Sequence, residues 1–139
     1  IENPTEAQEE AIDSWREEQL EHIEKLSKAI HEYPQSAYAY RRRGTYFSDL
    51  SEYENAIDDY TKSIELDSSF ALAYVLRGDC YFLQKNYEAA LIDYCTAIEL
   101  KPNKESYYVD RARVYDKLNE PEKAEADRKK AKELREGND

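Results

Sequence analysis

The chain has 139 residues, of which 37% are charged, and its formal net charge is −11 at pH 7. Its length suits one domain with a substantial core, and its three glycines and four prolines, beside abundant Glu, Ala, Lys and Leu, predict an all-α protein. The negative charge and the lack of an apolar run of about 20 residues argue against a nucleic-acid partner and against membrane insertion.

Residues 1–36 carry most of the excess negative charge and are predicted to form an acidic N-terminal helical extension. The segment 5–33 contains no Gly or Pro. Its large apolar residues follow the three- and four-residue spacing of a helix with one apolar face, interrupted around Gln19 and His22: Ile12, Trp15, Ile23, Leu26, Ile30 and Tyr33. We expect one helix of about 40 Å, at 1.5 Å per residue, and a hairpin that bends at residues 16–19 is the alternative.

An exposed patch at Ile12 and Trp15 is the consequence of the long helix. Such a helix would extend beyond its neighbour and leave both side chains in solvent, where they would bind a partner or a second copy of the chain. A homodimer that forms through this face is therefore our alternative function. If the helix does not protrude, Trp15 packs on the first full repeat instead.

A sequence repeat with a period of 34 residues begins at Ala37. Residues 37–70 and 71–104 are identical at thirteen aligned positions, and a third copy continues in phase over residues 105–138. Each unit contains two segments with apolar residues three and four positions apart, separated by a short turn. The predicted helices span residues 37–50, 53–66, 71–84, 87–100, 105–118 and 121–135.

The repeat resembles the tetratricopeptide repeat family. Each unit has the family's large, small, aromatic and alanine positions in the same order: Tyr40, Gly44, Phe47 and Ala56, then Tyr74, Gly78, Tyr81 and Ala90, then Tyr108, Ala112, Tyr115 and Ala124. The resemblance implies an all-α, right-handed solenoid of antiparallel helix pairs that binds other proteins and has no catalytic activity or cofactor. Residues 20–33 match the second helix of a further unit, and the polar helix at 121–135 is expected to end the stack.

Three arginines and three aspartates recur with the repeat: Arg43, Arg77 and Arg111, and Asp59, Asp93 and Asp127. Each arginine occupies a position at which the family usually has leucine, so its charge needs a partner between the helices. We predict a structural ladder of partly buried Arg–Asp pairs, within or between units. The alternative is that these charges are solvated and repeat only through duplication.

The resemblance implies that the first helices of the units form a groove for an extended peptide or an amphipathic helix. The predicted groove residues are Tyr38, Arg41, Arg42, Thr45, Leu72, Val75, Leu76, Asp79, Phe82, Leu83, Val109, Arg113 and Lys117. The middle unit is apolar and has cations on both sides, which suits a partner with hydrophobic anchors and some acidic residues. Alternatively, the acidic N-terminal segment of the same chain or of a neighbouring one covers this patch.

The chaperone-tail clamp of some family members is not expected. The matching positions are Arg41, Thr45, Leu76, Ser106 and Asp110, of which only the arginine has the required charge.

The tripeptide Arg77-Gly78-Asp79 has the form of a cell-adhesion motif, but the repeat places it in mid-helix. We expect its arginine to pair with Asp93, its glycine to allow close packing, and Asp79 alone to face a partner.

No set of residues indicates a catalytic or metal site. Cys80 is expected in the core and Cys95 at a half-buried helix position, and neither belongs to a CxxC motif. His22 and His31 do not share a helix face that could hold a metal. The lack of a signal-peptide pattern predicts a cytoplasmic location, and the start at Ile1 without any Met indicates a processed or partial chain.

Overall fold

The computed structural model describes residues 1–137, and within them the chain is helical and contains no strand. Its helices are α1 (Glu6–Glu32), α2 (Ala37–Asp49), α3 (Tyr53–Leu66), α4 (Ala71–Leu83), α5 (Tyr87–Leu100), α6 (Glu105–Lys117) and α7 (Pro121–Glu136). Helices α2 to α7 agree with the six predicted repeat helices to within one residue at each end, so the all-α solenoid of helix pairs is confirmed. The end of the predicted third unit, Asn138, lies outside the described residues.

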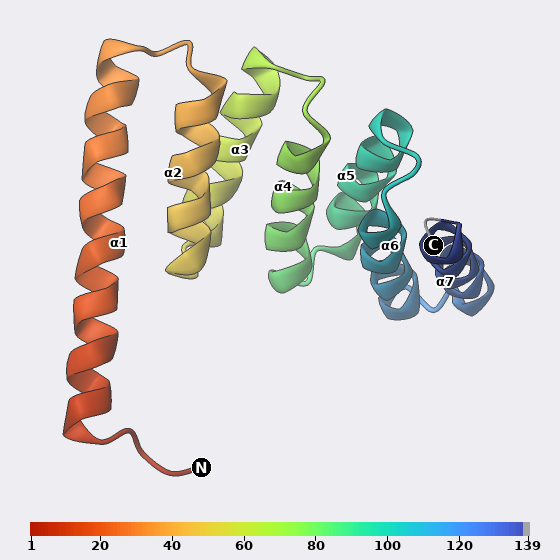
Figure 1. Ribbon diagram of the computed structural model, residues 1–139, viewed down its shortest axis with the longest axis horizontal. Coiled ribbons are helices and arrows are strands. Elements are labelled where there is room, and N and C mark those ends of the chain that lie inside the picture. Colours follow the sequence, from red (N-terminus) through yellow and green to blue (C-terminus); the bar gives the residue numbers. More distant parts are fainter. Residues whose placement is uncertain (138–139) are drawn as a thin grey trace.

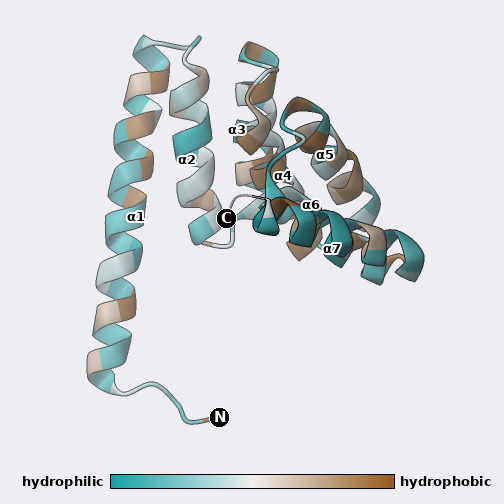
Figure 2. Cartoon of the chain, turned by 45° about the vertical axis from the view of Figure 1, so that its right-hand side comes forward, coloured by the Kyte–Doolittle hydropathy of each residue, from teal (hydrophilic) through white to brown (hydrophobic). Residues whose placement is uncertain are grey.

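The helices pack in chain order as an open stack (Figure 1). Helices α2 and α3, α4 and α5, and α6 and α7 form antiparallel pairs, and successive pairs meet where α3 contacts α4 and α5 contacts α6. Hydrophobic residues gather on α3, α4 and α5 in the middle of the stack, whereas α1 and α7 at its two ends are mostly hydrophilic (Figure 2). On α7 the buried residues are Ala124, Asp127 and Ala131, which all face α6, as expected for the end of the stack.

The turn between the two helices of each unit uses one residue with left-handed backbone. Ser51, Lys85 and Asn119 have φ values of 60°, 63° and 57°. The next amide closes the turn, as when Asn86 donates to the Tyr81 carbonyl at 2.9 Å. Because three different non-glycine residues adopt this conformation, the packing of the two helices fixes the turn and overrides the ordinary steric cost.

Two glycines allow the paired helices to approach closely. A Cβ atom on Gly44 would lie 3.0 Å from the ring of Tyr60, and one on Gly78 would lie 3.0 Å from the ring of Tyr94. The third unit has Ala112 at the glycine position and Arg128 at the position of the two tyrosines. The small residue and the aromatic ring therefore act as a pair, and a Cβ is accommodated where the ring is missing.

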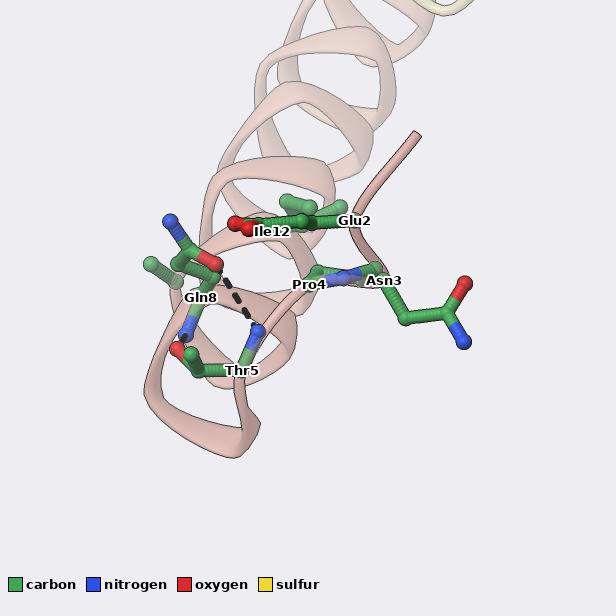
Figure 3. A pocket seen from close by; sticks show the side chains of 7 residues that line it. Glu2, Asn3, Pro4, Thr5, Gln8 and Ile12 are labelled. Atoms are coloured by element: carbon green, nitrogen blue, oxygen red, sulfur yellow. Dashed lines mark hydrogen bonds between the residues drawn. The ribbon is translucent and has the colours of Figure 1, made fainter.

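Helix α1 is continuous from Glu6 to Glu32, as the long-helix prediction states, so the alternative hairpin with a bend at residues 16–19 is wrong. A capping box starts the helix: the Gln8 amide donates to the Thr5 hydroxyl at 3.3 Å, and the Thr5 amide donates to the Gln8 side chain at 2.8 Å (Figure 3). The C-terminal half of α1 packs on α2, and its N-terminal half extends beyond the end of α2 (Figure 1).

Candidate functional site

Each recurring arginine holds the aspartate of its own unit with two parallel hydrogen bonds. Arg77 donates from Nε and Nη2 to the two carboxylate oxygens of Asp93, at 2.9 and 2.7 Å. The same fork joins Arg43 to Asp59 and Arg111 to Asp127. All three aspartates are buried, and the hydrogen bonds that Arg77 donates to Asp93 raise the pKa of the Arg77 guanidinium. The charges are therefore paired between the helices and are not free in solvent.

The third nitrogen of each arginine reaches the preceding unit. The Nη1 atom of Arg77 donates to the Thr61 hydroxyl at 3.1 Å, that of Arg43 to the Ser27 hydroxyl at 3.1 Å, and that of Arg111 to the Cys95 sulfur at 3.6 Å. Each Arg–Asp pair, which is one rung of the ladder, thus links the two helices of its own unit to the helix that precedes them. The three acceptors are spaced by 34 residues, so the sequence repeat itself marks them, although none of them carries a charge that would indicate a partner for arginine.

The contact of Arg43 with Ser27 shows how α1 joins the stack. Ser27 lies on α1 at the position that Thr61 occupies on α3. The C-terminal half of α1 therefore contacts the first unit as the second helix of a preceding unit would, while its N-terminal half runs straight on without folding back.

A hollow of about 240 Å³ lies where α4, α5 and α6 meet, and we call it the α4–α6 hollow. Its lining residues are Asp79, Phe82, Leu83, Tyr94, Asp110 and Arg113. The Tyr94 hydroxyl donates to the Asp79 carboxylate from the floor of the hollow. Arg113 lies over the ring of Phe82 at 4.7 Å and 3.8 Å from Asp110. The hollow combines an apolar wall with two carboxylates and one guanidinium.

Burial and mutual repulsion alter the two carboxylates of this hollow. Burial raises the pKa of Asp79, although the hydrogen bond from Tyr94 opposes the change. The pKa of Asp110 is raised to about 6, chiefly by burial and secondly by the negative charge of Asp79, while the positive charge of Arg113 lowers it. Both carboxylates lie at first-helix positions that the resemblance assigns to the inner surface, Asp79 among the predicted groove residues and Asp110 among the clamp positions, but a sequence pattern does not give the distance between neighbouring helices.

The predicted groove residues divide into exposed, half-buried and buried side chains. Tyr38, Leu72, Leu83 and Val109 are exposed large apolar residues. Leu76 and Phe82 are half-buried and pack against the core clusters. Val75 is 6% exposed and belongs to the same buried cluster as Tyr107, so its assignment to the open groove is wrong. The neighbouring unit covers it, which the single-helix pattern could not indicate.

The cations beside the middle unit are held against aromatic rings. Arg41 lies 4.1 Å from the centre of the Phe70 ring and 5.5 Å from that of Tyr38. Arg42 donates to the Tyr46 hydroxyl at 3.1 Å. Lys117, at the end of α6, is instead exposed and lines a second depression with Phe82 and Arg113.

The tripeptide Arg77-Gly78-Asp79 lies within α4 and its parts have separate contacts. Arg77 pairs with Asp93, Gly78 faces the Tyr94 ring, and Asp79 accepts the Tyr94 hydrogen bond at the edge of the α4–α6 hollow. Thr45, at the position of Asp79 in the first unit, forms the corresponding hydrogen bond with Tyr60 at 3.1 Å. The motif is therefore part of the repeat and not an exposed loop.

The cysteine and histidine side chains either pack within the stack or lie in solvent. Cys80 is buried and Cys95 is half-buried, as predicted. His22 stacks on Tyr46 with ring centres 4.7 Å apart, and His31 is exposed. Among residues 1–137, no three His, Cys, Asp or Glu side chains gather in a group that could hold a metal ion. In the same part of the chain, none of the helices is both long and apolar enough to span a membrane.

Ile12 and Trp15 lie on the protruding half of α1. Their exposed fractions are 46% and 43%, so the alternative in which Trp15 packs on the first full repeat is wrong. Helix α1 contacts α2, at the far end of the stack from the α4–α6 hollow. The acidic segment therefore does not cover the hollow of its own chain.

Several solved structures have the same fold. A crystal structure of MamA is 28% identical, with a TM-score of 0.81 over 84% of this chain and 68% of that one. YrrB, described as a TPR protein with an unusual peptide-binding site, is 31% identical, with a TM-score of 0.73 over 82% of this chain and 59% of that one. The first TPR of Spaghetti (RPAP3), bound to the HSP90 peptide SRMEEVD, is 27% identical, with a TM-score of 0.70 over 72% of this chain and 79% of that one.

Family models give the same result at the level of sequence. No curated protein matches the chain. One model of the tetratricopeptide repeat matches residues 41–105, and a second matches residues 105–138. Together these matches cover residues 41–138, which include every residue of the Arg–Asp ladder. The chain therefore belongs to the tetratricopeptide repeat family.

Proposed function

We propose that the chain is a non-catalytic scaffold for protein–protein interaction, and that the face formed by α4 and α6 binds a peptide or an amphipathic helix of a partner. The observation that carries the proposal is the set of exposed apolar side chains on these two helices: Leu72 and Leu83 on α4, of which Leu83 lines the α4–α6 hollow, and Val109 on α6, next to the hollow residue Asp110. Large apolar residues that remain exposed beside a hollow are typical of recognition surfaces. The rigid ladder beneath them keeps this surface preformed.

Two related structures support a peptide ligand. The RPAP3 repeat domain is bound to a peptide, and YrrB is described as having a peptide-binding site. We infer a partner with hydrophobic anchors for Leu72 and Leu83 and with acidic residues near Arg42 and Lys117. The α4–α6 hollow itself has two carboxylates and one guanidinium, so acidic side chains of the partner should lie outside it.

A selection from a random peptide library displayed on phage tests this proposal. The matched variants are Leu72→Glu with Leu83→Glu, and Ile92→Glu on the outer face of α5, where Ile92 is also exposed. All three positions are solvent-accessible, so the variants should keep their fold. We expect peptides selected on the unmodified chain to bind the Ile92 variant equally and to lose at least about tenfold in affinity for the double variant. Equal binding to both variants would show that the face formed by α4 and α6 is not the peptide-binding site.

A further inference from the structure

The protruding part of α1, residues 6–18, is the largest uncovered element of the molecule, and we call it the α1 overhang. All thirteen of its residues are exposed, and no other helix packs against it (Figure 1). The capping box at Thr5 and Gln8 keeps the helix intact up to its first turn. The overhang is therefore a formed helix with an open face.

The open face continues the apolar face that already packs in the stack. Ile12, Trp15, Gln19 and Ile23 are spaced three and four residues apart, so they follow one side of the helix. Gln19 is buried and Ile23 is half-buried where α1 meets α2, while Ile12 and Trp15 lie beyond that contact. A helix that packed on Ile12 and Trp15 would extend this interface.

A second feature shapes this face near Ile12. The segment from Glu2 to Thr5 leads away to one side of the first turns of α1, and an open hollow of about 650 Å³ lies between this segment and the helix (Figure 3). Pro4, Ala11 and Ile12 are among its lining residues. An apolar side chain of a docked helix would enter this hollow beside Ile12.

The negative charge of the α1 overhang determines which kind of helix could bind to it. Residues 6–18 contain six acidic residues and one arginine, and Arg16 lies 3.8 Å from Asp13. Glu9 and Glu18 lie one helical turn from Ile12 and Trp15 and flank the apolar pair. A second overhang in contact with this face would bring like charges together, which disfavours the homodimer. A helix with lysine or arginine beside its apolar stripe would be attracted.

We propose that the α1 overhang docks a cationic amphipathic helix of another protein, independently of the α4–α6 face. Apolar side chains of that helix pack on Ile12 and Trp15, and its basic residues face Glu9 and Glu18. Tryptophan is a frequent anchor at the centre of such contacts, and helix-in-groove recognition uses the same three- and four-residue spacing.

Trp15 gives a direct readout, because it is the one tryptophan in the chain. The experiment titrates the full chain with three synthetic peptides while Trp15 fluorescence is followed with excitation that tyrosine does not absorb. The first peptide is an amphipathic helix of leucine and lysine. The second has glutamate for every lysine, and the third has the leucine–lysine composition in an order without an apolar face. We expect a saturable blue shift of Trp15 with the first peptide only.

Matched variants separate this site from the groove. Ile12→Ser should weaken binding of the leucine–lysine peptide about tenfold, whereas Ile92→Ser and the Leu72→Glu, Leu83→Glu variant should not. Glu9→Gln with Glu18→Gln should weaken it and reduce its dependence on salt. Circular dichroism checks that each variant keeps its helices.

Three results would overturn the proposal. One is a lack of any shift with the leucine–lysine peptide. Another is an equal response to the glutamate peptide or to the peptide of permuted order, because the contact would then need neither the charge nor the apolar stripe. The third is a blue shift of Trp15 with protein concentration alone, together with a dimer in light scattering, because a second copy would then occupy the face. These outcomes can be interpreted even if the phage experiment shows that the α4–α6 face binds no peptide, because they depend only on the α1 overhang.

Discussion

Arg77 and Asp93 are joined by two hydrogen bonds of 2.9 and 2.7 Å, and the third guanidinium nitrogen of Arg77 reaches Thr61 of the preceding unit at 3.1 Å. Asp93 is 2% exposed, so its charge has little access to water. The pair therefore holds α4 against both α5 and α3. Because the same geometry occurs in all three units, the ladder defines the spacing of the stack.

Removal of one partner of this rung should be strongly destabilising. We predict that Asp93→Ala lowers the free energy of unfolding by about 3–5 kcal/mol, because Arg77 would remain between the helices without its counter-charge. Replacement of both residues by leucine should cost much less, since neither charge is then left unpaired. Urea unfolding of the three proteins measures the difference, and unchanged stability in Asp93→Ala would mean that the charges are solvated.

The close contact between Gly78 and Tyr94 predicts an unusual response to alanine. In an exposed helix interior, Gly→Ala normally stabilises by about 0.5–1 kcal/mol. At this position the new Cβ would meet the Tyr94 ring at 3.0 Å, and the ring is buried and tied to Asp79. We expect Gly78→Ala to lower the melting temperature, at a cost of about 1–3 kcal/mol.

The third unit supplies the control for that prediction. Ala112 has no tyrosine opposite it, so Ala112→Gly should follow ordinary helix propensity and cost about 0.5–1 kcal/mol. A Gly78→Ala variant that melts at a higher temperature than the unmodified chain would show that the Tyr94 ring can move away.

Asp110 should make the fold less stable at neutral pH than at mildly acidic pH. Its pKa is raised to about 6 in the folded chain, from an ordinary value of 3.8, so the folded state binds more protons between these values. The stabilising contribution of the protonated carboxyl is complete below about pH 4 and disappears as the pH rises through about 6. The side chain is 21% exposed, so the difference should not exceed about 3 kcal/mol.

Substitution of Asp110 by asparagine tests this dependence. We expect Asp110→Asn to raise the stability at pH 7 and to flatten the stability profile between about pH 4 and pH 6. Asp116→Asn is the control, because Asp116 lies six residues further along α6, is exposed, and pairs with Arg128 outside the hollow. An unchanged profile in Asp110→Asn would mean that Asp79 and Arg113 balance its charge at every pH.

The chain should not bind the peptide SRMEEVD that the RPAP3 domain holds. Of the positions that a chaperone-tail clamp would use, Arg41 is stacked on Phe70, Leu76 is apolar, and Asp110 would repel a carboxylate. Calorimetric titration with this peptide, with the RPAP3 domain as the positive control, should show no heat of binding for this chain. Saturable binding as strong as that of the RPAP3 domain would contradict the expectation that this chain has no chaperone-tail clamp.

The repeat made most of the fold predictable. A period of 34 residues places both helices of each unit, and the conflict of an arginine with a leucine position indicated a buried partner at the recurring aspartate. These features depend on spacing along one chain, which a sequence displays directly.

Features that depend on contacts between units were not predictable in the same way. Val75 is buried because the next unit covers it, and Tyr94 and Asp110 meet Asp79 only when α4, α5 and α6 are assembled. The straight course of α1 was the expected one of two alternatives, but the interrupted apolar spacing of residues 5–33 did not exclude a bend at residues 16–19.

The most direct test of the proposed function is to map a selected peptide on the protein by NMR. Backbone amide shifts of the isotopically labelled chain would be compared before and after addition of a phage-selected peptide. We predict that the largest changes lie on α4 and α6, at Leu72, Leu83, Val109 and their neighbours. Changes confined to α5 and α7, with α4 and α6 unaffected, would contradict it.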